Sequence, residues 1–123
     1  VRFADGSSWF QEDIGSNTFN EGQFPSIDVS PTGTLAVAYY RCARASSEED
    51  CDPTVDGVIF AWRTGSGVWR SEVVDEGAAS HCGTNISLSF GPDGRAHISY
   101  VCVRHLGGSD FVSELKVASR RAL

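Results

Sequence analysis

Apolar and polar residues alternate with a period near two along most of the chain, in short runs separated by clusters of Gly, Pro, Asp and Ser. This pattern is typical of antiparallel β-strands joined by hairpins, and no stretch has the spacing of an amphipathic helix. The predicted strands are residues 2–4, 9–14, 26–30, 34–41, 57–63, 68–75, 86–90, 95–103 and 113–119. The sequence therefore predicts an all-β protein.

The strand pattern repeats within the chain. The segment SIDVSPTGTLAVAY at 26–39 returns as SLSFGPDGRAHISY at 87–100, and each residue lies 61 positions after its counterpart. Shorter matches extend the repeat: WFQEDI at 9–14 matches WRSEVV at 69–74, and VRFA at 1–4 matches VIFA at 58–61 and LKVA at 115–118. A period in this range is typical of stacked or radial repeat folds, in which each unit buries a face against its neighbour.

The repeat divides a single domain, residues 1–123, into units of four strands. Residues 25–75 form a complete unit, residues 85–119 an incomplete second unit, and residues 1–14 the last strands of a preceding unit. Four-stranded antiparallel units of this length predict a β-propeller-type fold with two blade units. Because such folds usually need three or more units, we expect other copies of the chain or the rest of a parent chain to complete the ring.

Short and long links between the predicted strands fall at opposite ends of the units. SPTGT and GPDGR, between the first and second strands, have the Pro and Gly of tight turns, and DGSS and TGSG, between the third and fourth strands, are equally short. In an up-and-down unit these turns share one end. The long links, 15–24, 42–56, 76–84 and 104–112, therefore gather at the opposite end, which we call the long-loop end and take as the candidate functional surface.

Charge and hydropathy exclude some classes of partner. Ten basic and sixteen acidic side chains give a net charge of −6 at neutral pH, which repels phosphate backbones, so we expect no nucleic-acid partner. No apolar run approaches the roughly 18 residues of a membrane-spanning helix, so we expect no membrane span.

The four cysteines favour two disulfides over a zinc site, because no closely spaced cysteine pair is present. If the first two strands of the second unit pair around their tight turn, Cys82 and Cys102 lie opposite each other within disulfide reach, give or take a bulge. Cys42 and Cys51 bracket one long link and most simply close it. Both bridges lie at the long-loop end, and they indicate a secreted or extracytoplasmic protein.

Comparison of the two units separates packing residues from candidate ligand-binding residues. Tyr39 and Tyr100 recur in both units, as do the tryptophans of the fourth strands, and we interpret them as packing between units. Trp62 and Tyr40 have no aromatic counterpart and are candidate ligand-binding residues, because an aromatic ring can stack on a sugar. The alternative for both is that they fill an uneven gap between the units.

The histidines have different settings. His97 lies in a predicted strand, and we interpret it as a hydrogen-bonded core residue. His81 and His105 lie in long links of one unit and could meet, and together with Asp110 they are candidate ligand-binding residues. With Asp110 or Asp75 they are also candidate metal ligands. Two imidazoles and a carboxylate also suit a transition metal, although no fixed ligand spacing supports one. The metal content of the protein is left open.

The first long link concentrates carboxylates, namely Glu48, Glu49, Asp50, Asp52 and then Asp56. Calcium accepts such oxygens, but the alternation and the Gly of an EF-hand loop are absent. A solvated acidic loop is the alternative that we favour, and we expect no other cofactor.

The motifs LKVA, DGSSW, GVW with Glu12 or Glu72, and SLSFGPDGRAHISY resemble the blade repeats of secreted bacterial β-propeller proteins of the sialidase-like and BNR-like kind. ADGSSW at 4–9 falls where those propellers carry the Asp-box S-x-D-x-G-x-x-W, although Asp5 is one residue too near Trp9 and the second copy, TGSGVW, lacks the Asp. The resemblance implies a propeller fold, an extracellular setting, and carbohydrate as the commonest ligand class. No segment matches enough of the sialidase catalytic set to carry those roles over.

These observations favour a non-enzymatic recognition module that binds glycans through the long-loop end. Aromatic rings there would stack on sugar faces, while polar side chains would bond the hydroxyls. Two alternatives stay open. The chain is a fragment of a sialidase-like glycoside hydrolase propeller, or it is a structural surface or assembly protein.

Overall fold

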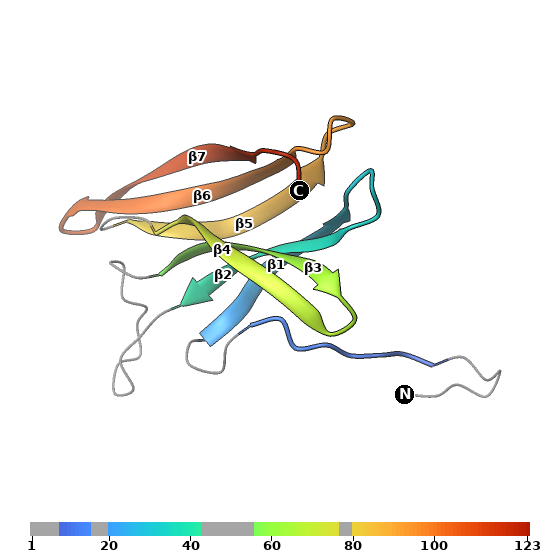
Figure 1. The fold of residues 1–123 in the computed structure, drawn as a ribbon. Helices are drawn as coiled ribbons and strands as arrows, with labels where there is room; N and C mark the ends of the chain where they lie inside the picture. The colour runs from blue at the N-terminus through green and yellow to red at the C-terminus, as the bar shows by residue number, and fades with distance from the viewer. Residues whose placement is uncertain (1–7, 16–19, 43–55, 77–79) are drawn as a thin grey trace.

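The computed structural model describes residues 8–15, 20–42, 56–76 and 80–123 (Figure 1). These residues contain the strands β1 (Asn20–Val29), β2 (Leu35–Cys42), β3 (Gly57–Gly65), β4 (Val68–Asp75), β5 (His81–Phe90), β6 (Ala96–Gly107) and β7 (Asp110–Arg120). The strands build two antiparallel sheets, with the orders β1-β2-β3-β4 and β5-β6-β7. The prediction of an all-β, antiparallel protein is confirmed. In this part of the chain, no helix has the length and apolar character that crossing a membrane requires.

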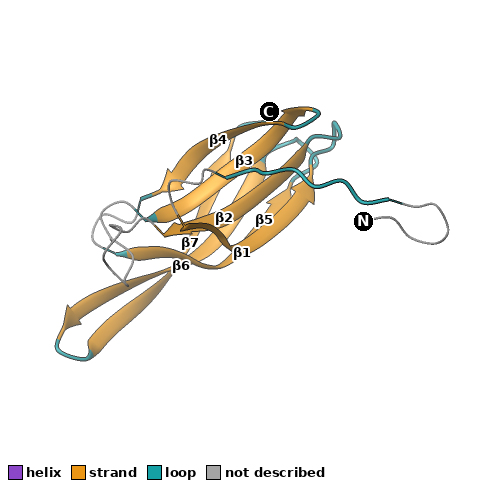
Figure 2. Cartoon of the chain, turned by 90° about the horizontal axis from the view of Figure 1, so that it is seen from below, coloured by secondary structure: helices purple, strands orange, loops and turns teal. Residues whose placement is uncertain are grey.

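Each sheet is an up-and-down meander, since every strand pairs with the next strand along the chain. β5 packs against β1, β2 and β3, so the three-stranded sheet lies across one face of the four-stranded sheet, as Figure 2 shows from below. The strand order agrees with the order predicted for each unit.

The turns between β1 and β2 and between β5 and β6 have the same hydrogen bonds. Gly33 N–H donates to the Ser30 carbonyl at 2.8 Å, and Gly94 N–H donates to the Gly91 carbonyl at 2.9 Å. Gly33 and Gly94 have φ values of 89° and 80°, in the left-handed region that favours glycine. This requirement explains why both turns carry a Gly at the same place.

The repeat extends further along β1 and β5 than the sequence predicts. Gly22 and Gly83 both have positive φ, and so do Phe24 and Asn85, which lie two residues further along each strand. The register of each hairpin shifts at these residues. Bulges near the long-loop end are therefore part of the repeated unit, and they bend both strands there.

The main core lies between the two sheets. It comprises Ala36, Ala38, Val58, Phe60, Cys82, Leu88, Ala96, Ile98, Tyr100 and Cys102. The small alanines of β2 let the sheets approach each other, and the ring of Phe60 fills the space beside them. Phe60 stacks on Trp62 with ring centroids 5.6 Å apart and meets the edge of Phe90 at 6.5 Å.

The opposite face of the four-stranded sheet carries a second cluster, formed by Val37, Tyr39, Ile59 and Ala61. Ile14 and Trp69 pack against this cluster. The sequence predicts a strand at 9–14, but these residues belong to neither sheet. Their side chains contact the face of the sheet instead of adding a strand to its edge.

Glu12 attaches this segment to the sheet. Its carboxylate accepts hydrogen bonds from Arg63 Nε at 3.0 Å, from Trp69 Nε1 at 2.8 Å and from Gly67 N–H at 3.1 Å. The hydrogen bond from Arg63, followed by that from Trp69, holds the pKa of Glu12 below its usual value.

The same contact occurs between the two sheets. Glu72 on β4 forms an ion pair with Arg120 on β7, and these two residues are the repeat counterparts of Glu12 and Arg63. The stacking of residues 9–14 on the four-stranded sheet therefore repeats the stacking of β4 on the three-stranded sheet.

Side chains of β1 also bond the backbone of β5. Ser26 Oγ accepts a hydrogen bond from Leu88 N–H at 2.9 Å, and Asp28 Oδ2 accepts one from Phe90 N–H at 2.8 Å. β5 is the first strand of its sheet, so these bonds satisfy backbone donors at a sheet edge.

Some predicted boundaries are wrong. The ladder between β6 and β7 continues to the pair Gly107 and Asp110, so the link expected to be long at 104–112 is a hairpin with a tight turn. Gly107 and Gly108 have positive φ and close this turn. β1 and β5 begin before the predicted strands, because pairing with β2 and β6 continues past their bulges.

Candidate functional site

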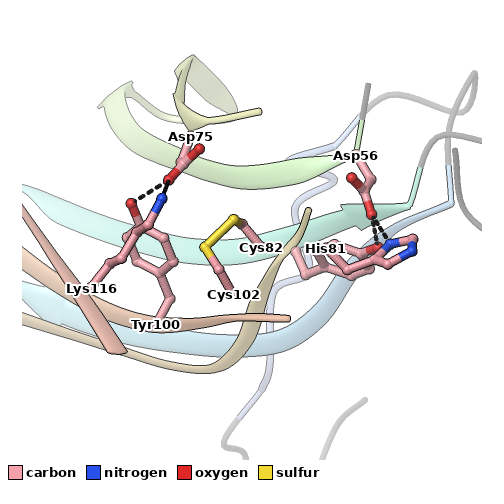
Figure 3. Close-up of a disulfide and its surroundings, with 8 residues drawn as sticks. Asp56, Asp75, His81, Cys82, Tyr100, Cys102 and Lys116 are labelled. Carbon is pink, nitrogen blue, oxygen red and sulfur yellow. Dashed lines mark hydrogen bonds and ion pairs between the residues drawn. A yellow bond between two sulfur atoms is a disulfide. The ribbon is translucent and has the colours of Figure 1, made fainter. Parts of the chain in front are cut away.

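The long-loop end of the four-stranded sheet holds a buried carboxylate. Asp56, directly before β3, is fully buried, and its Oδ2 lies 2.5 Å from the Tyr40 hydroxyl and 2.8 Å from His81 Nδ1. Tyr40 lies in β2 and His81 begins β5, so residues from three parts of the fold meet at this carboxylate (Figure 3). We call Tyr40, Asp56 and His81 the Asp56 cluster.

The chemistry of the carboxylate fixes the hydrogen-bond roles in this cluster. A carboxylate oxygen only accepts, so the Tyr40 hydroxyl and His81 Nδ1–H both donate to Asp56 Oδ2. His81 contacts Asp56 through Nδ1 and not through Nε2, and 39% of its side chain is exposed. Asp56 Oδ1 is buried and has no hydrogen-bond partner among the described residues. The cluster therefore has a partly exposed imidazole whose Nε2 is not bound to Asp56, and a buried carboxylate oxygen, Oδ1, that accepts no hydrogen bond from the described residues.

Tyr40 is a fixed neutral donor. Burial, followed by the hydrogen bond to Asp56, raises the pKa of Tyr40 well above its usual value. The phenol therefore stays protonated at any physiological pH. Its hydrogen bond keeps the Asp56 carboxylate in one orientation, and this in turn orients the ring of His81.

Two residues of the bulged strands surround Tyr40. A Cβ added at Gly83 would lie 2.6 Å from Tyr40 Cδ2, so the ring rests directly against this glycine. The ring of Phe24 lies with its centroid 6.4 Å from that of Tyr40, and Phe24 is 46% exposed. An exposed aromatic ring therefore lies next to the buried polar cluster.

We expect Gly83→Ala to lower the free energy of unfolding by about 1–3 kcal/mol. Gly83 has a φ of 128°, which strains any other residue, and the new Cβ would displace the Tyr40 ring. Chemical denaturation followed by fluorescence measures the loss. Gly107→Ala is the matched control, since its φ is 122° and no atom lies within 4 Å of the added Cβ. Equal losses in the two variants would show that the contact with Tyr40 has no effect of its own.

A second carboxylate ties the two sheets together beside the disulfide. Asp75, at the end of β4, accepts a hydrogen bond from the Tyr100 hydroxyl at 2.8 Å and one from Lys116 Nζ at 3.4 Å (Figure 3). Burial, followed by the bond to Asp75, raises the pKa of Tyr100. These bonds join β4 to β6 and β7, which indicates a structural role for Asp75.

Cys82 and Cys102 form a disulfide between β5 and β6, with their Cα atoms 4.0 Å apart. They are direct partners in the ladder, next to a register shift, so the predicted pairing is confirmed. Cys42 is disulfide-bonded as well. Cys51 lies outside the described residues, and its pairing with Cys42 stays a prediction.

Within the described residues, one set of three metal-ligating groups comes close together: Asp75, Cys82 and Cys102, with ligand atoms within 4.8 Å of one another. Both sulfur atoms belong to the disulfide, so this set cannot bind a metal as thiolates. The residues considered for calcium, Glu48, Glu49, Asp50 and Asp52, lie outside the described residues.

Trp62 and His97, both considered in the sequence analysis, lie outside the Asp56 cluster. Trp62 packs against the main core, and the guanidinium of Arg120 lies 4.7 Å from the centroid of its ring. It pairs with Ala36 near the short-turn end of β3, away from the Asp56 cluster at the other end of this strand. His97 is partly exposed and shares a hydrogen bond with Ser119 Oγ at 2.8 Å, so the expected hydrogen bond is present but the expected place in the core is wrong.

His105 and Asp110 lie on the extended β6–β7 hairpin. The ring of His105 lies 6.3 Å from that of Phe111, its partner in the ladder. Of the ligand-binding residues that the sequence predicts, Tyr40 and His81 are the two that share a hydrogen-bonded cluster in the described structure.

The expectation that Asp56 belongs to a solvated acidic loop is wrong, because Asp56 is fully buried, and Phe24 was missed altogether in the sequence. Asp56 ends an acid-rich link, and its place directly before a buried strand distinguishes it from the other acids. Phe24 lies 61 positions before Asn85, so it is an aromatic that one unit has and the other lacks. The criterion that selects Trp62 and Tyr40 also selects Phe24.

Comparisons with protein-family models, with curated proteins and with solved structures find no match for the chain. The function is therefore argued from the fold and the site themselves.

Proposed function

We propose that this chain is a propeller-type recognition module that binds glycans through Phe24 and the Asp56 cluster. The observation that carries the proposal is an exposed aromatic ring beside a buried carboxylate that orients a half-exposed imidazole. A sugar presents an apolar face and a ring of hydroxyl groups. Phe24 would take the apolar face, and His81 would bond a hydroxyl.

The stacking of the sheets supports the propeller-type assignment. Equivalent Glu–Arg pairs join residues 9–14 to the four-stranded sheet and β4 to the three-stranded sheet. A contact that recurs from unit to unit in one direction is characteristic of radial and stacked repeat folds. Further blades would come from other copies of the chain or from a longer parent chain.

The hydrogen bonding of His81 supports the choice of a hydroxyl-rich ligand. Because Nδ1–H donates to Asp56, the neutral imidazole has its lone pair on Nε2, where it accepts a hydrogen bond. A sugar hydroxyl donates to such a nitrogen. The Cys82–Cys102 disulfide supports the secreted or extracytoplasmic setting in which glycans are met.

The proposal favours recognition over hydrolysis. Glycoside hydrolysis needs a pair of carboxyl groups that flank the scissile bond. Asp56 and Asp75 each bond a tyrosine hydroxyl of the protein and face different partners. If the chain releases a fluorescent group from aryl glycosides, the proposal of recognition without catalysis is wrong and a glycoside hydrolase is favoured.

Glycan binding is measured on an array and then by calorimetry with the best ligand found. Phe24→Ala and His81→Ala are each expected to weaken binding about tenfold or more, because each removes a direct ligand contact. Phe111→Ala and His105→Ala are matched controls, since they change the same residue types in a pair on the β6–β7 hairpin. Lack of binding to any glycan, or equal losses in all the variants, would contradict the proposal.

A further inference from the structure

The outer edge of β7 has room for another strand. β7 pairs with β6 on one side, and among the described residues no strand pairs with its other side. In the four-stranded sheet, β4 occupies the equivalent position next to β3. A strand edge presents backbone donors and acceptors in a row, which is a template for a further strand.

Among the described residues, a hollow beside this edge lacks the indole that lines the equivalent space beside Glu12. Glu12 accepts hydrogen bonds from Arg63 and from the indole of Trp69. Glu72 bonds Arg120, and no indole reaches it within the described part of the chain. The hollow next to Glu72 has a volume of about 200 Å³ and is lined by Phe60, Val74, Ile98, Ala118, Ser119 and Arg120. Largely apolar walls with one carboxylate acceptor suit an indole ring that donates its N–H.

We infer that this edge and hollow bind residues 9–14 of a second copy of the chain. The segment WFQEDI is the repeat counterpart of WRSEVV in β4. Trp9 of the second copy would enter the hollow and donate its indole N–H to Glu72, as Trp69 donates to Glu12. The inference rests on the stacked repeat in the proposed function and is independent of the glycan ligand.

The observed pairing of β3 with β4 sets the register of the docked strand. In that pairing Trp69 lies opposite Arg63 and Val73 lies opposite Ile59. The repeat counterparts are Trp9 opposite Arg120 and Asp13 opposite Lys116. Asp13 is exposed and Lys116 is partly exposed. Opposite charges directly across two strands stabilise their pairing.

The same arrangement covers apolar surface on both copies. Leu115 on the outer face of the three-stranded sheet is 76% exposed, and Ile27 on the far face of the four-stranded sheet is 63% exposed. The repeat counterpart of Ile27 is Leu88, which is buried between the sheets. The second copy would therefore stack its four-stranded sheet on the outer face of the first copy's three-stranded sheet.

Cysteine cross-linking between two variants tests the docking and its register. Ser71 lies opposite Ala61 in the observed pairing, so the docked strand has position 11 opposite position 118. A mixture of the Gln11→Cys chain with the Ala118→Cys chain is expected to give a disulfide-linked heterodimer under mild oxidation. The matched control mixes Gln11→Cys with Ser113→Cys, whose position is about 17 Å along β7 and out of register. Linking in neither mixture, or equally in both, would overturn the inference.

A charge reversal gives a second readout without added thiols. Asp13→Arg places a cation opposite Lys116 and is expected to weaken self-association about fivefold in sedimentation experiments. Glu76→Arg makes the same change of charge at an exposed residue away from the edge and is expected to leave association unchanged. If the Asp13→Arg chain self-associates as tightly as the unmodified chain, the proposed register of the docked strand is wrong. Glycan binding is read separately, so loss of docking with retained glycan binding refutes this inference alone.

Discussion

Phe60→Ala is expected to lower the free energy of unfolding by about 3–5 kcal/mol. Phe60 is buried between the sheets, where its ring contacts Trp62 and Phe90 and lies 5.9 Å below the guanidinium of Arg120. Removing the ring leaves a cavity that the paired strands on both sides cannot close. Chemical denaturation, followed by tryptophan fluorescence and circular dichroism, measures the loss.

Phe111→Ala is the matched control for this change. Phe111 is exposed on the β6–β7 hairpin, and its removal is expected to cost less than about 1 kcal/mol. A loss of the same size in both variants would mean that the two sheets do not share the core around Phe60. Coincident transitions by the two probes are expected in the unmodified chain, since one core joins both sheets.

Joint replacement of Cys82 and Cys102 by alanine is expected to lower the free energy of unfolding by about 3 kcal/mol. The bridge closes a sequence separation of 20 residues and so limits the freedom of the unfolded chain. It also fixes β5 next to Gly83, the residue that supports Tyr40. The loss is measured by denaturation without reductant, so that Cys42 keeps its own disulfide.

A second cross-strand pair of the same sheet provides the control. His97 and Ser119 share a hydrogen bond on the exposed surface, and their joint replacement by alanine is expected to cost less than about 1 kcal/mol. A double cysteine variant as stable as the unmodified chain would contradict the role of the Cys82–Cys102 bridge. If the proposed glycan binding is found, its strength in this variant shows separately whether the bridge positions the Asp56 cluster.

Local features made much of the fold predictable from the sequence. The turns at Gly33 and Gly94 need a residue that tolerates positive φ, and their neighbours alternate apolar and polar residues. These requirements are met by adjacent residues, so they appear directly in the sequence. The Cys82–Cys102 pairing was predictable from the same hairpin once a bulge was allowed for, because the turn sets the partners near it and the bulges shift the register before the cysteines.

The rest depends on contacts that adjacent residues do not encode. Asp56 is identified by Tyr40 and His81, which come from β2 and β5, and no local pattern brings these residues together. The β6–β7 hairpin was missed because its end is largely exposed, so no buried face imposes alternation there. The segment at 9–14 alternates like a strand because one side packs on a sheet, even though its backbone joins neither sheet.

The repeated contact between units is directional, because it joins one face of a unit to the opposite face of the next. In the proposed docking, a copy has a donor segment at 9–14 on one side and an acceptor edge at β7 on the other, and two copies joined once would still present one of each. A chain whose donor segment is impaired keeps its acceptor edge and can still be bound by an unmodified copy. Such a chain would act as a terminator in mixtures, and a small fraction of it would limit the size of every assembly that it joins.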